Sequence, residues 1–220
     1  MKLTFDIKDL QHGDHVCLLY QSSAEQKNMV GSFIKDGLQR GELCLYLADE
    51  GIDSGLARLL AAEGVDMLRL QQEGSLQVLN RYQSFLRYAR FEPILMREFY
   101  ERIFRETVMD RYSGLRVFAD MTWALSIGCE QLITFEALLN DFLPQWKMTH
   151  LCLYNIERFA PNILQDVLAT HSIAVINGHV CPNFYYAPDF VIGKHDPKVK
   201  LQWMLNTLKK ASVMGKAYKP

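Results

Sequence analysis

Short apolar runs alternate with amphipathic stretches along most of the chain. The apolar runs predict buried strands at 15–20, 43–48, 76–79, 115–120, 151–154 and 173–176. The helical spacing of apolar residues between them predicts helices at 24–39, 54–63, 130–143 and 161–171. This alternation is typical of βαβ units, so we expect an α/β fold in which a mostly parallel sheet is covered by helices on both faces.

Two further helical regions complete the pattern. The longest is expected over about 82–110, with a new helix starting at Pro93 because proline is tolerated in the first helical turn. A C-terminal helix is expected over about 198–211, with a frayed tail after it. Its apolar period favours packing on the domain over docking on a membrane or a partner. Since no linker or composition break divides residues 1–220, we expect a single domain.

Composition excludes several classes of protein. The net charge is −1, so no broad basic field indicates direct nucleic-acid binding. No apolar run approaches the ~18 residues that span a bilayer, and the N-terminus lacks a signal-peptide core. The five cysteines include no CxxC pair, which favours reduced thiols. We therefore expect a cytoplasmic protein without a transmembrane segment.

Polar and aromatic residues follow the predicted strands, at the edge of a parallel sheet where ligands bind. We expect a pocket for a small organic molecule there, formed by Tyr20, Gln21, Asp49, Glu50, Asp120, Trp123, Tyr154 and Asn155. The aromatic residues would form its walls, and the acids with Asn155 would anchor the ligand. The alternative is that these are ordinary loop starts and helix caps, with Ser22 or Ser23 capping the helix that follows.

The loop after the first strand lacks the residues that hold a triphosphate. A phosphate-binding loop needs closely spaced glycines and a Lys followed by Ser or Thr. The segment 20–31 reads YQSSAEQKNMVG, with no glycine before Gly31 and no hydroxyl residue after Lys27. The chain therefore has the layout of a P-loop NTPase without its phosphate cradle.

A second group of chemically active residues is expected at the opposite edge of the sheet. His15, His150 and His171 lie near strand starts, and Cys17, Cys44 and Cys152 lie in strands. These residue types suit a transition metal, but close ligand pairs are missing. Buried cysteines also behave as small apolar residues. We therefore predict no metal and no cofactor.

Two groups of residues could support catalysis, and neither pattern is specific. Asp120 and Glu50 could pair for acid–base work. A cysteine nucleophile would need an exposed thiol beside a histidine, and only Cys129 and Cys181 fall outside the predicted strands. We predict no catalytic residues.

Several stretches, taken in order, resemble the MEDS family of sensory domains over about residues 10–208. They are GDHVCLLY (13–20), RGELCLYLADE (40–50), GLRVFADMTWAL (114–125), FEALLN with Glu136 (135–140), LCLYNIERFAP (151–161), ATHSIAVINGHV (169–180) and PNFYY (182–186). The resemblance implies a three-layer fold similar to RecA and KaiC but without the phosphate loop. By the same comparison, Glu50 stands at the position of a water-activating acid and Asp120 at the end of the Walker B strand. Asn155 departs from the acid that the family tends to show.

The resemblance implies a sensory role, with ligands among small hydrocarbon derivatives. Relatives are often fused to helix-turn-helix, histidine kinase or anti-sigma modules, whereas we expect no output domain within residues 1–220. We therefore expect a non-enzymatic sensor that acts through a separate kinase, regulator or anti-sigma type protein, or through an identical subunit. The alternatives are an interaction module without a ligand, whose surface would be the helix over 94–110, and a residual ATPase using Asp120, Glu50 and magnesium.

Overall fold

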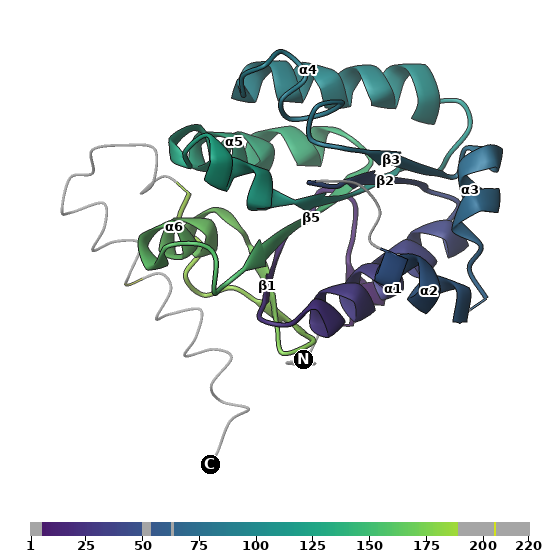
Figure 1. The fold of residues 1–220 in the computed structure, drawn as a ribbon. Helices are drawn as coiled ribbons and strands as arrows, with labels where there is room; N and C mark the ends of the chain where they lie inside the picture. The colour runs from purple at the N-terminus through teal and green to yellow at the C-terminus, as the bar shows by residue number, and fades with distance from the viewer. Residues whose placement is uncertain (1–5, 50–53, 63, 189–204, 206–220) are drawn as a thin grey trace.

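The computed structural model describes residues 6–49, 54–62, 64–188 and 205, and a seven-stranded sheet lies at its centre (Figure 1). The strand order is β3-β2-β4-β5-β1-β6-β7, and all neighbours pair in parallel except β6 and β7. The strands are β1 (His15–Tyr20), β2 (Leu43–Leu47), β3 (Leu76–Leu79), β4 (Leu115–Asp120), β5 (Met148–Asn155), β6 (Ile173–Ile176) and β7 (His179–Pro182). The mostly parallel sheet is confirmed.

Helices cover both faces of this sheet, which makes three layers (Figure 1). The helices are α1 (Ser23–Gln39), α2 (Ser54–Ala62), α3 (Met67–Glu73), α4 (Pro93–Ile103), α5 (Glu130–Phe142) and α6 (Pro161–Thr170). Buried residues of α1, α2 and α3 join one apolar cluster, and those of α4, α5 and α6 join another. The sheet separates the two clusters because successive side chains of a strand point to opposite faces. The expected three-layer α/β fold is therefore confirmed.

The helix expected over 82–110 is wrong in its first part. Residues 81–90 form successive turns instead. The Asn80 side chain starts them by accepting hydrogen bonds from the backbone N–H groups of Tyr82 and Gln83 at 3.0 and 3.1 Å. The helix begins at Pro93, as expected from its position in the first turn, and continues through a π-helical turn, Phe104–Val108.

Two short elements were not expected from the sequence. Asp66 caps α3 by accepting from the N–H of Arg69, and Gly74 ends it at φ 79°. Strand β7 folds back on β6 through Asn177 and Gly178, whose φ angles of 51° and 74° fit the two-residue hairpin turn that Asn-Gly favours.

Some expectations fall on residues that the structure does not describe. Glu50 and, apart from Leu205, the helix expected over 198–211 lie outside the described residues. Among the residues that are described, no helix combines the length and apolar character required to cross a bilayer.

Candidate functional site

The carboxyl edge of the sheet brings two acids together at the ends of β2 and β4. The Thr122 hydroxyl lies 3.1 Å from Asp49 Oδ2 and 2.8 Å from Asp120 Oδ1. Arg81 donates from Nη1 to Asp49 Oδ1 at 3.0 Å. The backbone N–H of Thr122 also donates to Asp120, so Asp120 caps the 3-10 helix η3 (Met121–Ser126). Asp49 and Asp120 are thus joined by one hydroxyl, and Asp49 is partly neutralised by one arginine; the pair expected from the sequence, Asp120 with Glu50, includes a residue that the structure does not describe.

Burial dominates the electrostatics of this edge. It raises the pKa of Asp120, and the hydrogen bonds from Thr122 only partly offset that effect while the Asp49 charge adds to it. Burial also raises the pKa of Tyr20, at the end of β1, and the charge of Asp120 adds to the rise whereas Arg158 opposes it. Tyr20 is therefore a neutral phenol near a desolvated carboxyl group.

The remaining polar residues expected at this edge take local roles. The N–H of Gln21 donates to the Glu25 carboxylate at 3.1 Å, and Ser22 caps α1 by accepting from the N–H of Glu25. Asn155 Oδ1 accepts from the N–H of Glu157 at 2.9 Å and so holds a turn after β5. These contacts match the capping alternative that the sequence left open.

Trp123 and Tyr154, two of the three aromatic residues expected as pocket walls, do not line this edge. The Trp123 ring is fully buried and stacks on Phe85 at a centroid distance of 4.4 Å, with Phe91 at 4.5 Å. Tyr154 is also fully buried, and its hydroxyl donates to Glu136 Oε1. Their side chains turn into the core under α4 and α5, so the expectation of an aromatic rim is corrected to a polar edge.

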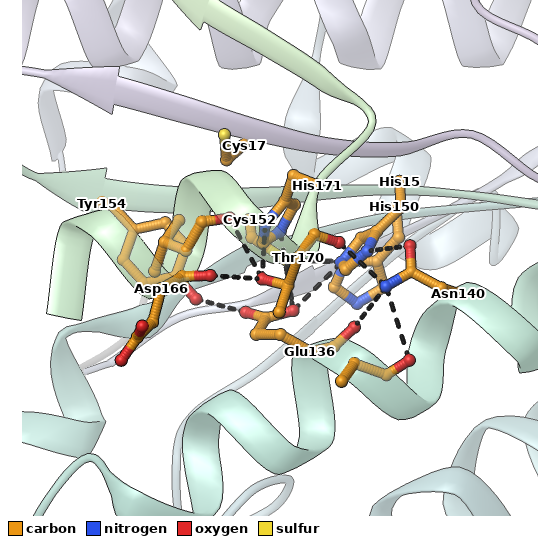
Figure 2. A network of polar contacts seen from close by, with 12 residues as sticks. His15, Cys17, Glu136, Asn140, His150, Cys152, Tyr154, Asp166, Thr170 and His171 are labelled. Atoms are coloured by element: carbon orange, nitrogen blue, oxygen red, sulfur yellow. Dashed lines mark hydrogen bonds and ion pairs between the residues drawn. The ribbon is translucent and has the colours of Figure 1, made fainter. Parts of the chain in front are cut away.

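A second and more enclosed polar group lies between the sheet and α5 (Figure 2). His15 from β1, Cys152 from β5 and His171 at the end of α6 surround the carboxylate of Glu136 from α5. All four side chains are buried, and one ligand-type atom from each lies within 4.8 Å of the others. The parallel pairing of β1 with β5 places His15 opposite His150 and Cys17 opposite Cys152.

The hydrogen-bond partners of His15 place a proton on its Nδ1 atom. The amide nitrogen of Asn140 donates to the carbonyl groups of Glu136 at 3.1 Å and Thr170 at 2.8 Å. The amide oxygen therefore faces His15 Nδ1 at 3.3 Å and must accept. His15 Nε2 then points at Glu136 Oε2, 3.0 Å away.

His171 is oriented in the same way by a backbone group. Its Nδ1 lies 2.7 Å from the carbonyl oxygen of Val167, which can only accept, so Nδ1 carries a proton. Burial lowers the pKa of His171 to about 3, and the nearby charge of His15 adds to that. In this neutral ring Nε2 is a bare acceptor, and it has no hydrogen-bond partner among the described residues.

Glu136 is held as a carboxylate in spite of its burial. Burial alone would raise its pKa, but the positive charge that His171 and His15 carry when protonated, with the hydrogen bonds from His15 and Tyr154, outweighs burial and lowers the pKa to about 2. Burial and the Glu136 charge raise the pKa of Cys152 well above its usual value, so its thiol donates to Glu136 Oε2 at 3.4 Å. The centre of this group is thus a buried anion facing two imidazoles.

His150 supports the group from behind. Its Nε2 lies 2.8 Å from the Tyr100 hydroxyl and its Nδ1 lies 3.1 Å from Cys152 Sγ. Burial lowers the pKa of His150 to about 3, with His15 adding to the effect. The neutral ring therefore relays one hydrogen bond from Tyr100 toward the sulfur.

The sequence predicted part of this group and missed its centre. The expected grouping of histidines and cysteines included Cys44, but Cys44 packs on the opposite face in the cluster under α1 and α2. Cys181, expected outside a strand, lies in β7. Glu136 was not expected as a site residue; the available signal was an acid on the apolar face of a helix, with Asn140 one turn later.

Comparison with known proteins gives three findings. The sequence pattern of the MEDS family, the methanogen/methylotroph, DcmR sensory domain, matches residues 14–172. The transcriptional repressor DcmR of Methylorubrum extorquens is 24% identical over 169 residues, which are 74% of this chain and 60% of that protein. The chain thus spans less than two thirds of that relative.

The third finding concerns the fold alone. The crystal structure of a KaiC-like protein from Pyrococcus horikoshii superposes with a TM-score of 0.50 at 13% identity, covering 74% of this chain and 70% of that one. The RecA/KaiC-like description of the three layers is thereby supported.

Proposed function

The chain belongs to the MEDS family of sensory domains, and from this premise we propose that it is a non-enzymatic sensor whose input site is the carboxyl edge of the sheet. The ligand is a small organic molecule that carries a hydrogen-bond donor, such as a hydroxyl or amine. A separate regulatory protein reads the liganded state. Kinship with a transcriptional repressor supports the regulatory role.

The observation that carries this proposal is the single hydroxyl shared by two carboxylates. Thr122 Oγ1 is within bonding distance of both Asp49 Oδ2 and Asp120 Oδ1, yet a hydroxyl has one proton to donate. When the hydroxyl donates to Asp120, whose Oδ1 also accepts from the N–H of Thr122, the partly buried Asp49 Oδ2 is left for another donor. A ligand donor that enters between the two acids satisfies it, and such an interaction with an ionised partner is worth about 1.5–3 kcal/mol.

The same threonine links the edge to the core. Thr122 lies in η3, and the next residue, Trp123, is packed between Phe85 and Phe91. A ligand that takes the place of the Thr122 hydroxyl between the acids favours a different position of η3. The populations of two arrangements then shift under α4, and that change is available to a partner.

Binding is tested by thermal shift and calorimetry on the full chain with short-chain alcohols, amines, halogenated hydrocarbons and nucleotides. We expect at least one donor-bearing organic compound to raise the Tm of the wild type and to lose at least about tenfold in affinity, which is 1.4 kcal/mol, in Asp49→Asn. Asp110→Asn, which removes an exposed acid, is the matched control and retains binding. The proposal is wrong if no compound binds, or if Asp49→Asn binds as tightly as the control.

The absence of catalysis is tested separately. Phosphate release from ATP with magnesium is measured for the wild type and Asp120→Asn. We expect equal background in both, because the loop after β1 has no glycine cradle. Release by the wild type above that of the variant would replace the sensor proposal with the residual ATPase.

A further inference from the structure

We propose that His15, Glu136, Cys152 and His171 form a buried binding site for a divalent transition metal ion, with Zn²⁺ as the best match. This site lies between α5 and the face of the sheet and is separate from the carboxyl edge. The argument rests on the spacing of the four atoms, on their lone pairs and on the balance of charge.

Four of the six separations between the ligand atoms come close to those around one tetrahedrally coordinated ion. Zinc bonds of about 2.0–2.3 Å to nitrogen, oxygen and sulfur place neighbouring ligand atoms about 3.3–3.6 Å apart. Glu136 Oε2 lies 3.0 Å from His15 Nε2, 3.4 Å from Cys152 Sγ and 3.6 Å from His171 Nε2. His15 Nε2 lies 3.7 Å from Cys152 Sγ. The two remaining separations, from His171 Nε2 to His15 and to Cys152, are within 4.8 Å, so loading the ion requires the side chains to adjust around it.

A proton cannot satisfy this group of atoms. The outer nitrogens of both imidazoles donate to fixed acceptors, Asn140 Oδ1 and the Val167 carbonyl oxygen. The inner nitrogens, His15 Nε2 and His171 Nε2, therefore both face the Glu136 carboxylate. A single proton can connect only one of these two nitrogens to the carboxylate. His171 Nε2 is left without a hydrogen-bond partner in the described part of the chain, and a buried acceptor in that condition costs about 1–3 kcal/mol. One metal ion accepts all the lone pairs at once.

Charge balance and donor type select the metal. Glu136 and Cys152 as carboxylate and thiolate carry two negative charges, which a divalent ion cancels, and buried charges must be compensated. Imidazole and thiolate suit zinc and its neighbours, whereas magnesium and calcium prefer oxygen. Four protein ligands leave no open position, which is typical of a structural zinc site. The ion would join β1, α5, β5 and the end of α6.

The surrounding residues have the roles of partners that orient metal ligands. Asn140 and the Val167 carbonyl group hold the two imidazoles, and Tyr154 donates to the second oxygen of Glu136. His150 Nδ1 lies 3.1 Å from Cys152 Sγ and can donate to a thiolate while Nε2 accepts from Tyr100. Such outer contacts are characteristic of real metal sites, because they fix the tautomer and aim the lone pair.

The test is the metal content of the untagged full chain. All four ligands are buried, so the metal is supplied in the growth medium or during refolding, as Zn²⁺ or as Co²⁺. We expect about one equivalent per chain. The cobalt form should show a thiolate-to-metal band in the near ultraviolet, and X-ray absorption should report one sulfur and three nitrogen or oxygen ligands.

Two cysteine variants form a matched pair, because Cys17 and Cys152 face each other across β1 and β5 and are both fully buried. Cys152→Ser should lose the thiolate band, and Cys17→Ser should keep it. Folded wild type that takes up no metal by either route overturns the proposal, as does a band that survives in Cys152→Ser. If Cys152→Ser does not fold, the X-ray absorption of the wild type decides: any sulfur count other than one contradicts the site.

Discussion

At the scale of the residue, burial and hydrogen-bond direction decide what each ionisable group can do. Asp120 and Glu136 are both largely buried acids, yet the pKa of Asp120 is raised and that of Glu136 is lowered to about 2. The difference comes from their partners: Asp120 has the donors of Thr122 and a second acid nearby, whereas Glu136 has two imidazoles and the Tyr154 hydroxyl. Asp120 is therefore the acid whose charge weakens the native state.

This assignment predicts the pH dependence of Asp120→Asn. A folded pKa above the ordinary 3.8 means that ionisation of Asp120 opposes folding. This loss of stability is absent at pH values below 3.8 and grows as the pH rises from there to the folded pKa. The Asn side chain keeps an oxygen that accepts from Thr122. We expect the Tm of the variant, relative to the wild type, to increase as pH rises from about 4 toward neutrality. Calorimetry across this range checks it, with Asp110→Asn as background; a difference that falls with pH contradicts the assignment.

The placement of single residues was predictable only in part. Asp49 and Asp120 end strands, and the rule that strand ends meet at one edge brought them together. Tyr154 also lies near a strand end, but it follows His150 and Cys152 at a spacing of two residues. The three side chains therefore lie on the same face of the sheet, toward α5. Glu136 could not be found this way, because its partners come from β1, 121 residues before it, and from β5 and the end of α6 after it, and only the fold brings them together.

At the scale of the element, α1 shows how closely a helix can approach the sheet. A Cβ added to Gly37 would lie 2.6 Å from Arg116 Cδ and 2.9 Å from Cys44 Sγ. Arg116 is fully buried there, with Asp36 Oδ2 2.9 Å from its Nη1. The glycine is therefore required by contact between layers, although it lowers helix propensity.

We accordingly predict that Gly37→Ala destabilises the protein by about 1–3 kcal/mol, because the overpacked side chains must move together. Gly31→Ala in the same helix is the control, since its Cβ would meet chiefly the flexible end of Leu59 at 2.9 Å. There the gain in helix propensity, about 1 kcal/mol, offsets the contact. Urea denaturation measures both; equal losses would show that the approach at Gly37 is not the cause.

Elements were predicted well where periodicity and caps agreed, and poorly where they did not. The bounds of α1 and α5 follow their apolar stripes closely. Residues 81–90 have enough apolar residues to suggest a helix, yet the Asn80 side chain captures the N–H groups of Tyr82 and Gln83 and directs the chain into turns. Side chains of this type compete with the backbone for hydrogen bonds. The spacing of apolar residues gives no information about that competition.

At the scale of the whole molecule, the sheet separates two buried polar networks. Under α1, Glu42 accepts from Arg116 Nε and its other oxygen lies 2.7 Å from His12 Nε2. Under α5, Glu136 gathers His15, Tyr154 and Cys152. Each network links a helix or loop to strands, but the two use opposite faces of the same sheet and share no hydrogen-bond partner among the described residues.

This separation predicts that the two networks contribute independently to stability. Glu42→Gln removes the carboxylate that pairs with Arg116, and Tyr154→Phe removes the hydroxyl that donates to Glu136; each should cost about 1–3 kcal/mol. Because residues without shared partners add within about 0.5 kcal/mol, the double variant should lose the sum. A double-mutant cycle from urea denaturation checks this. Coupling above about 1 kcal/mol would mean that the strands transmit strain between the faces, and a change at one network would then be felt at the other.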